Sequence, residues 1–211
     1  MPVTNTLAID NALALLDWKR RVFELYAAIR TEPRPKRAWR RWVEVRDELF
    51  GSHPQTPLDD EARSDFDGLE YFDYDPVARV IGTVESDDGT LEQLAAGAHA
   101  PIGFRRIGQV SFTLAGAEQR ARLYWLDAYG GGLFLPFVDE TSGSETYGGG
   151  RYLLDTVKGA DLGALDEGLV LDFNFAYNPS CSYDPRWACP LAPAGNRLSV
   201  PVRAGERQRS A

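Results

Sequence analysis

Lysine, histidine, cysteine and long apolar runs are all scarce in this sequence. Only three of its 23 Lys and Arg residues are lysines, and 31 acidic residues give a net charge of −8. A nucleic-acid-binding surface needs a surplus of basic side chains, so this balance argues against nucleic acid and against an anionic membrane surface as partners. No stretch reaches the roughly 18 apolar residues of a membrane span. The negative charge is itself typical of a soluble protein.

The N-terminus lacks the features of a secretory signal peptide. Such a peptide begins with basic residues, continues with an uninterrupted apolar core and ends in small residues. Here Asp10 interrupts the apolar residues, and Lys19, Arg20 and Arg21 follow them instead of preceding them. We therefore expect a cytoplasmic protein, in which the two cysteines are reduced thiols.

Apolar side chains recur with helical spacing in the first part of the chain. The stripe consists of Leu15, Trp18, Val22, Leu25 and Ile29. Residues three and four apart share one side of a helix, so this spacing predicts a helix over residues 10–30. Pro33 and Pro35 end it, because proline does not fit inside a helix. The following residues, 36–50, have a similar pattern and predict a second helix.

Short apolar runs separated by glycine-rich turns occupy the rest of the chain. Val110, Phe112 and Leu114 alternate with polar residues, which indicates a strand with one apolar face. The same alternation runs through residues 169–175 and, after the loop that holds the cysteines, through residues 198–202. Strands at such short spacing are typical of antiparallel sheets and not of βαβ units.

Together these elements predict an α+β fold that is mainly β. We expect an antiparallel, barrel-like or strongly curved sheet with two N-terminal helices packed against it. Two further strands are predicted at residues 69–74 and 77–84. We divide the chain into a helical segment, residues 1–52, and a β-rich domain, residues 53–211, which we expect to fold as one unit.

Several blocks of the sequence resemble one known family. They are HPQTPLDDEAR (53–63), FDGLEYFDYDP (66–76), DETSGSETYGGGRYL (139–153), LDFNFAYNPSCSYD (171–184), CPLAPAGNRL (189–198) and VRAGE (202–206). In this order they are similar to the family called domain of unknown function 1684, uncharacterised proteins of bacteria and archaea. The resemblance implies no activity and no cofactor.

Distinctive polar residues gather at the predicted strand ends and around the cysteine loop. Arginine binds carboxylates and phosphates in bidentate fashion, and Asn and Tyr orient small polar ligands. We therefore predict that the chain binds a small polar or anionic molecule beside this loop. The predicted site consists of Arg151, Tyr152, Asp172, Asn174, Tyr177, Asn178, Arg203 and Glu206. The alternative is an internal salt-bridge network without a ligand, such as a pair between Arg151 and Asp172.

Cys181 and Cys189 have seven residues between them in the loop. Zinc knuckles and most redox pairs have two residues between their cysteines, and structural zinc takes four ligands. No metal is therefore favoured, and a mixed site would have to combine both thiols with His53 and a carboxylate. Structural thiols, a loop disulfide, a redox pair and a thiol-dependent or metal-assisted enzyme all stay open.

The two predicted helices carry three tryptophans, Trp18, Trp39 and Trp42. Such a stripe packs either on the body of the same protein or on a partner. This leaves a structural or partner-binding protein as a third hypothesis, and the sequence does not define an oligomeric state.

Overall fold

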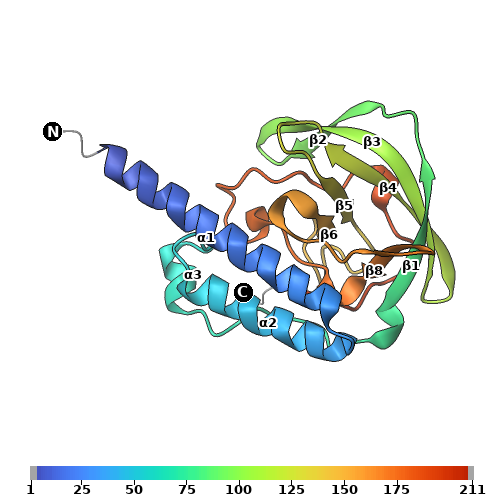
Figure 1. Ribbon diagram of the computed structural model, residues 1–211, viewed down its shortest axis with the longest axis horizontal. Coiled ribbons are helices and arrows are strands. Elements are labelled where there is room, and N and C mark those ends of the chain that lie inside the picture. Colours follow the sequence, from blue (N-terminus) through green and yellow to red (C-terminus); the bar gives the residue numbers. More distant parts are fainter. Residues whose placement is uncertain (1–3, 209–211) are drawn as a thin grey trace.

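Two long helices and a curved antiparallel sheet make up most of the fold (Figure 1). The computed structural model describes residues 4–208. Its helices are α1 (Thr4–Thr31), α2 (Pro35–Ser52) and α3 (Asp60–Ser64). Its strands are β1 (Arg79–Ser86), β2 (Leu91–Ala96), β3 (His99–Leu114), β4 (Ala117–Leu126), β5 (Leu133–Phe137), β6 (Arg151–Asp155), β7 (Ala164–Leu165) and β8 (Gly168–Asp172).

The helices α1 and α2 lie side by side along one side of the sheet, as Figure 1 shows. Both predicted helices are confirmed, and α1 begins earlier in the chain than the apolar stripe does. Leu25 and Ile29 of that stripe are buried, whereas Leu15 is exposed. The reason is visible in Figure 1, where the N-terminal half of α1 extends beyond the rest of the molecule.

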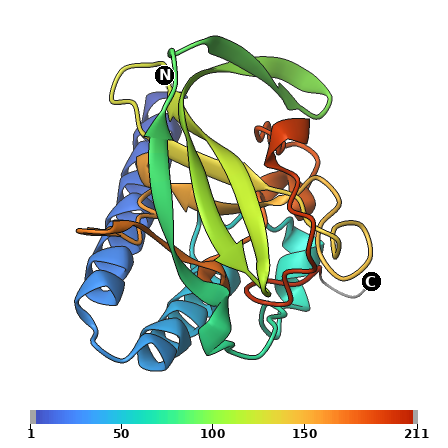
Figure 2. The ribbon, with the colours of Figure 1, turned by 90° about the vertical axis from the view of Figure 1, so that its right-hand side faces the viewer.

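The sheet is eight-stranded, and each pairing between its strands is antiparallel. The strand order is β6-β5-β4-β3-β1-β8-β7, and β2 pairs with the part of β3 that extends beyond β1. Register shifts within β3–β4 and β5–β6 accompany strong curvature, which Figure 2 shows. The predicted fold, a curved antiparallel sheet with two N-terminal helices packed against it, is confirmed.

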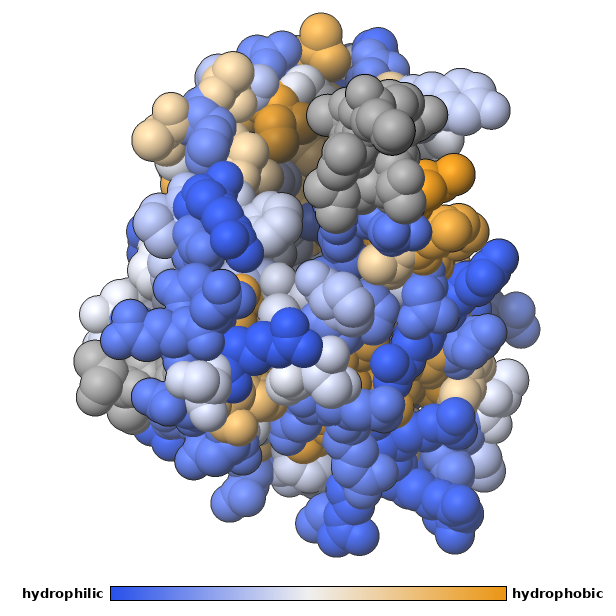
Figure 3. Space-filling view, turned by 90° about the vertical axis from the view of Figure 1, so that its left-hand side faces the viewer, coloured by the Kyte–Doolittle hydropathy of each residue, from blue (hydrophilic) through white to orange (hydrophobic). Residues whose placement is uncertain are grey.

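One hydrophobic core joins the helices to the concave side of the sheet. Trp42 of α2 is fully buried in the same cluster as Val110 of β3 and Leu171 of β8. The indole N–H of Trp42 donates to the Tyr26 hydroxyl of α1 (3.1 Å), which also fixes the two helices to each other. Figure 3 shows the side of the molecule toward which the N-terminal half of α1 extends, and this face is largely hydrophilic, with apolar residues mainly near its top.

The tryptophan stripe therefore packs mainly on the body of the protein. Trp39 is partly buried against the core, and Trp18 packs against a smaller cluster that contains Phe50. None of the described helices is long and apolar enough to cross a membrane.

The segment after the cysteine loop differs from the prediction of a strand at residues 198–202. Side chains bind its backbone in place of a regular ladder. Gln119 accepts from the Ser199 N–H (2.9 Å) and Asp139 accepts from the Val202 N–H (3.1 Å), while Arg151 donates to the Val202 carbonyl (2.8 Å). The predicted strand at residues 69–74 is likewise wrong, since only an isolated bridge between Tyr71 and Glu206 forms there.

The strand predicted over residues 169–175 ends early, at Asp172. The Asp172 carboxylate accepts hydrogen bonds from the backbone N–H and the side chain of Asn174 (3.1 and 2.8 Å). This side-chain cap starts a 3-10 helix at residues 173–175, so the alternation of a strand is lost. Both polar side chains are buried and neither lies on a solvated face.

Candidate functional site

A cavity of about 390 Å³ lies between α1 and the cysteine loop. We call it the α1–loop cavity. Its apolar walls are Leu15, Trp18, Pro57, Val157, Trp187 and Ala188. Its polar lining residues are Lys19, Gln55, Lys158, Ser180 and Cys189.

Hydrogen bonds from both sides of the cavity hold the cysteine loop in place. The Tyr152 hydroxyl of β6 donates to the Pro190 carbonyl (2.6 Å). The Trp187 indole donates to the carbonyl of Pro57 in the segment after α2 (3.1 Å). The loop is thereby tied to the sheet and to the helical segment, so its side chains have defined positions next to α1.

A smaller inner cavity of about 90 Å³ adjoins the α1–loop cavity and shares four lining residues with it. The shared residues are Trp18, Pro57, Lys158 and Ser180. The inner cavity is also lined by Arg46, Tyr152, Tyr177, Asn178 and Tyr183. Asn178 is buried, and its side-chain oxygen has no hydrogen-bond partner. That oxygen is available to a bound water or ligand.

The charge of these walls is opposite in sign to that of the whole chain. Among the described residues that line the two cavities, none is Asp or Glu. Two of the three lysines of the sequence, Lys19 and Lys158, line the larger cavity. The Lys158 ammonium is half-exposed and lies 3.4 Å from the Asp155 carboxylate, which lies outside the two linings.

A buried ion pair forms the base of the inner cavity. Arg46 of α2 lies 2.6 Å from the Glu206 carboxylate, and its guanidinium stacks on the rings of Trp42 and Tyr177. The Tyr183 hydroxyl also donates to Glu206, whose other oxygen accepts from the Asn178 N–H (3.0 Å). Burial raises the pKa of Glu206, although Arg46 and Tyr183 oppose this shift. Because Glu206 neutralises Arg46 and Asp155 pairs with Lys158, Lys19 is the cation of the described lining that has no ion-pair partner.

The structure brings together half of the eight residues predicted for the ligand site. Tyr152, Tyr177 and Asn178 line the inner cavity, and Glu206 supports it through Arg46. Cys189 lines the larger cavity, with Cys181 next to it. The cysteine loop is therefore a wall of the cavity, as the sequence predicts.

The other four predicted residues lie elsewhere. Arg151 is fully buried and pairs with Asp139 (3.0 Å), while it donates to three carbonyls of the C-terminal segment. Arg203 pairs with Glu145 on the surface (2.8 Å). Both arginines thus form internal ion pairs, which is the alternative to a ligand site. The partner of Arg151 is Asp139 and not Asp172.

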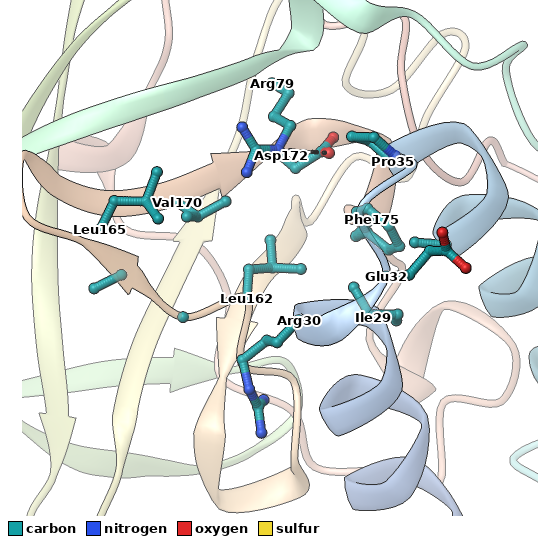
Figure 4. Close-up of a pocket in the computed structure, with 13 residues that line it drawn as sticks. Ile29, Arg30, Glu32, Pro35, Arg79, Leu162, Leu165, Val170, Asp172 and Phe175 are labelled. Atoms are coloured by element: carbon teal, nitrogen blue, oxygen red, sulfur yellow. Dashed lines mark ion pairs between the residues drawn. The ribbon is translucent and has the colours of Figure 1, made fainter.

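Asp172 lines a separate cavity of about 160 Å³ (Figure 4), and its carboxylate accepts a hydrogen bond from the Asn174 side chain (2.8 Å). Arg79 of β1 and Asp172 of β8 lie beside each other there, 3.8 Å apart. Burial raises the pKa of Asp172 to about 6, and the charge of Arg79 compensates only in part. Near this carboxylate, Glu32 and Arg30 give the cavity mixed charge.

His53, the histidine considered for a metal site, makes its hydrogen bonds with residues other than the two cysteines. The ring of His53 interacts with the Asp17 carboxylate (3.2 Å) through one nitrogen and with the Gln55 N–H through the other. Within residues 4–208, no group of three or more His, Cys, Asp and Glu side chains is placed to hold a metal ion.

Sequence reasoning missed the helical side of the site, namely Trp18, Lys19 and Arg46, and also Lys158. The first three lie more than a hundred residues before the cysteine loop, and only the folded chain brings them to it. One signal was available in the sequence, because lysine is rare in this chain.

The structure thus defines a class of protein: a curved antiparallel sheet whose helical flank and cysteine loop enclose a positively lined cavity. The chain belongs to the family described as protein of unknown function (DUF1684), which matches residues 64–207. It is also similar to the solution structure of an uncharacterized protein of Haloarcula marismortui. That similarity has 34% identity and a TM-score of 0.57, and it covers 78% of this chain and 89% of the other. No curated protein matches the chain.

Proposed function

We propose that this protein binds a small organic anion with an apolar or aromatic body in the α1–loop cavity. The observation that carries the proposal is the convergence of Lys19 and Lys158 on one cavity with no acidic side chain in its lining. In a chain with a net charge of −8 and three lysines, this local excess of positive charge favours an anionic ligand.

The size and the walls of the cavity support the same proposal. Its volume, about 390 Å³, lies in the range of small-molecule sites, which are mainly apolar with a few placed polar groups. Trp18 and Trp187 supply broad ring surfaces for an apolar body.

The experiment compares a carboxylate with its neutral amide and adds a phosphate ester as a second anion. Isothermal titration calorimetry is done with 2-naphthoate, phenyl phosphate and the neutral 2-naphthamide. A hydrogen bond to a charged group contributes about 1.5–3 kcal/mol, and the exposure of Lys158 places it at the lower end. We therefore expect the naphthoate to bind roughly tenfold more tightly than the amide.

A matched pair of variants tests the lysines. Lys158→Gln is expected to remove most of the preference for the anion, because it removes the ammonium from the cavity. Lys36→Gln makes the same change of net charge at an exposed position of α2 outside both cavities, and we expect it to bind like the wild type. Equal affinities for naphthoate and amide, or equal losses in the two variants, would refute the proposal.

A further inference from the structure

The two cysteines are neighbours in the structure, although more residues separate them in the sequence than in most redox motifs. Cys181 lies in a 3-10 turn at residues 180–182, and its backbone N–H donates to the Cys189 sulfur (3.3 Å). Since the N–Cα bond is about 1.5 Å long, the Cα of Cys181 lies within roughly 4.8 Å of that sulfur. This is close enough for a disulfide, and both residues are free thiols here.

The surroundings make the two thiols unequal. A hydrogen bond from the Cys181 thiol lowers the pKa of Cys189 to about 6 against the effect of burial, and the Cys181 N–H and the charge of Lys158 act in the same direction. That hydrogen bond, together with burial, raises the pKa of Cys181. Burial also raises the pKa of Tyr147, 3.7 Å from the Cys181 sulfur, and that of Tyr152, so both phenols stay neutral.

One cysteine of the pair borders the α1–loop cavity. Cys189 lines the α1–loop cavity beside Lys158 and Ser180, whereas Cys181 is not among its lining residues. Cys189 is buried and borders the cavity, whereas Cys181 is partly exposed and lies outside this lining. A nucleophilic cysteine next to a bound substrate, with a second cysteine within reach, is the arrangement that thiol–disulfide exchange requires.

We propose that Cys189 and Cys181 form a thiol–disulfide exchange pair that acts on small disulfides carrying anionic groups, bound in the α1–loop cavity. The exchange step rests on the pair itself, while the preference for anionic substrates rests on the proposed function.

The reaction proceeds in two balanced steps. The Cys189 thiolate attacks one sulfur of the small disulfide, the S–S bond breaks, and the first small thiol leaves with a proton. Cys181 then gives up its proton and attacks the Cys189 sulfur of the mixed disulfide, which releases the second small thiol. Two electrons pass from the cysteines to the substrate, so one small disulfide yields two small thiols and one Cys181–Cys189 disulfide. Excess small thiol reverses both steps.

Intact-protein mass spectrometry of the full chain follows this reaction directly. The reagents are glutathione disulfide, which is anionic, hydroxyethyl disulfide, which is neutral, and cystamine, which is cationic. We expect the wild type to lose two hydrogen atoms in mass with each reagent, and fastest with glutathione disulfide. Cys181→Ser should accumulate a stable mixed disulfide on Cys189. Cys189→Ser should react at least tenfold more slowly than the wild type. Circular dichroism verifies that both variants fold.

The pH profile separates this arrangement from an ordinary exposed thiol. With a pKa of about 6, Cys189 is about 90% ionised at pH 7, against about 3% for a free cysteine. The lower nucleophilicity of such a thiolate offsets most of this gain, so we expect only about a twofold faster reaction at pH 7. The rate should level off above pH 7 and fall about tenfold per pH unit below pH 6.

Two outcomes overturn the exchange pair: an unchanged rate in Cys189→Ser, or no adduct on Cys189 in Cys181→Ser with any of the reagents. Failure of the proposed function gives a different result. In that case the neutral reagent still forms the Cys181–Cys189 disulfide, but glutathione disulfide has no advantage over cystamine. If both proposals hold, Lys158→Gln slows the reaction with glutathione disulfide more than the reaction with hydroxyethyl disulfide, and Lys36→Gln slows neither.

Discussion

The buried carboxylate of Asp172 makes a quantitative prediction about stability. Burial raises its pKa to about 6, whereas an aspartate in the unfolded chain has a pKa of about 3.9. The folded protein thus holds a proton on Asp172 that the unfolded chain releases. The free energy of unfolding therefore falls as the pH rises from about 4 to about 6, and the loss amounts to about 3 kcal/mol.

Asp172→Asn removes this loss and keeps the local structure. The asparagine oxygen can accept the same two hydrogen bonds from Asn174, so the cap of the 3-10 helix is preserved. Only the interaction with Arg79, at 3.8 Å, is lost. We expect the variant to match the wild type near pH 4 and to exceed its free energy of unfolding by about 3 kcal/mol near pH 7.

Urea denaturation followed by circular dichroism, repeated between about pH 4 and pH 8, measures this difference. Asp10→Asn, at an exposed position of α1, controls for the change in net charge and should show no such trend. Two results would contradict the reasoning. One is a difference between variant and wild type that does not change with pH. The other is a variant that is less stable than the wild type near pH 7.

Two further predictions concern the buried polar residues that hold the C-terminal segment. Arg151→Met should lower the free energy of unfolding by about 3–5 kcal/mol, because it leaves the buried carboxylate of Asp139 unpaired. Arg203→Ala, at the exposed pair with Glu145, is the control and should leave the free energy of unfolding within error of the wild type. Asn196→Ala should cost about 2–3 kcal/mol, because buried backbone groups of Arg122 and Pro136 lose their partner. Urea denaturation measures all three, and a neutral Asn196→Ala would show that the segment is held otherwise.

The parts of the fold that follow local periodicity could be predicted from the sequence. The stripe from Leu15 to Ile29 predicts α1, and the alternation from Val110 to Leu114 predicts the centre of the sheet. In both cases the spacing of apolar side chains along a few turns or residues determines which face is buried. The curved sheet with helices at its side follows from these elements.

The segments that side chains hold could not be predicted in this way. Residues 198–202 alternate like a strand, but the side chains of Gln119, Asp139 and Arg151 make hydrogen bonds to their backbone that a neighbouring strand would otherwise provide. Asp172 ends β8 because its carboxylate accepts a hydrogen bond from the Asn174 N–H. The apolar alternation on either side gives no sign of this bond. In each case a polar side chain competes with the backbone ladder, and periodicity carries no information about such competition.

The candidate site was predicted on the side of the cysteine loop and missed on the side of the helices. Tyr152, Tyr177 and Asn178 are near the loop in the sequence as well as in space. Trp18 and Lys19 reach the cavity only because α1 passes over the loop, a contact between segments more than a hundred residues apart. Conversely, Arg151 could bind an anion by its chemistry, but its guanidinium is already hydrogen-bonded to backbone carbonyls and paired with Asp139.

Because α1 extends beyond the rest of the molecule, its contribution to stability and its contribution to the cavity wall come from different halves of the helix. The C-terminal half of this helix is part of the core, through Leu25 and Ile29, whereas Ile9, Leu13 and Leu16 of its N-terminal half are exposed. Substitutions in the first half therefore reshape one wall of the cavity, near Leu15, at little cost to stability. The proposed ligand preference of this chain can consequently be changed by mutations at one helix end while the sheet stays the same.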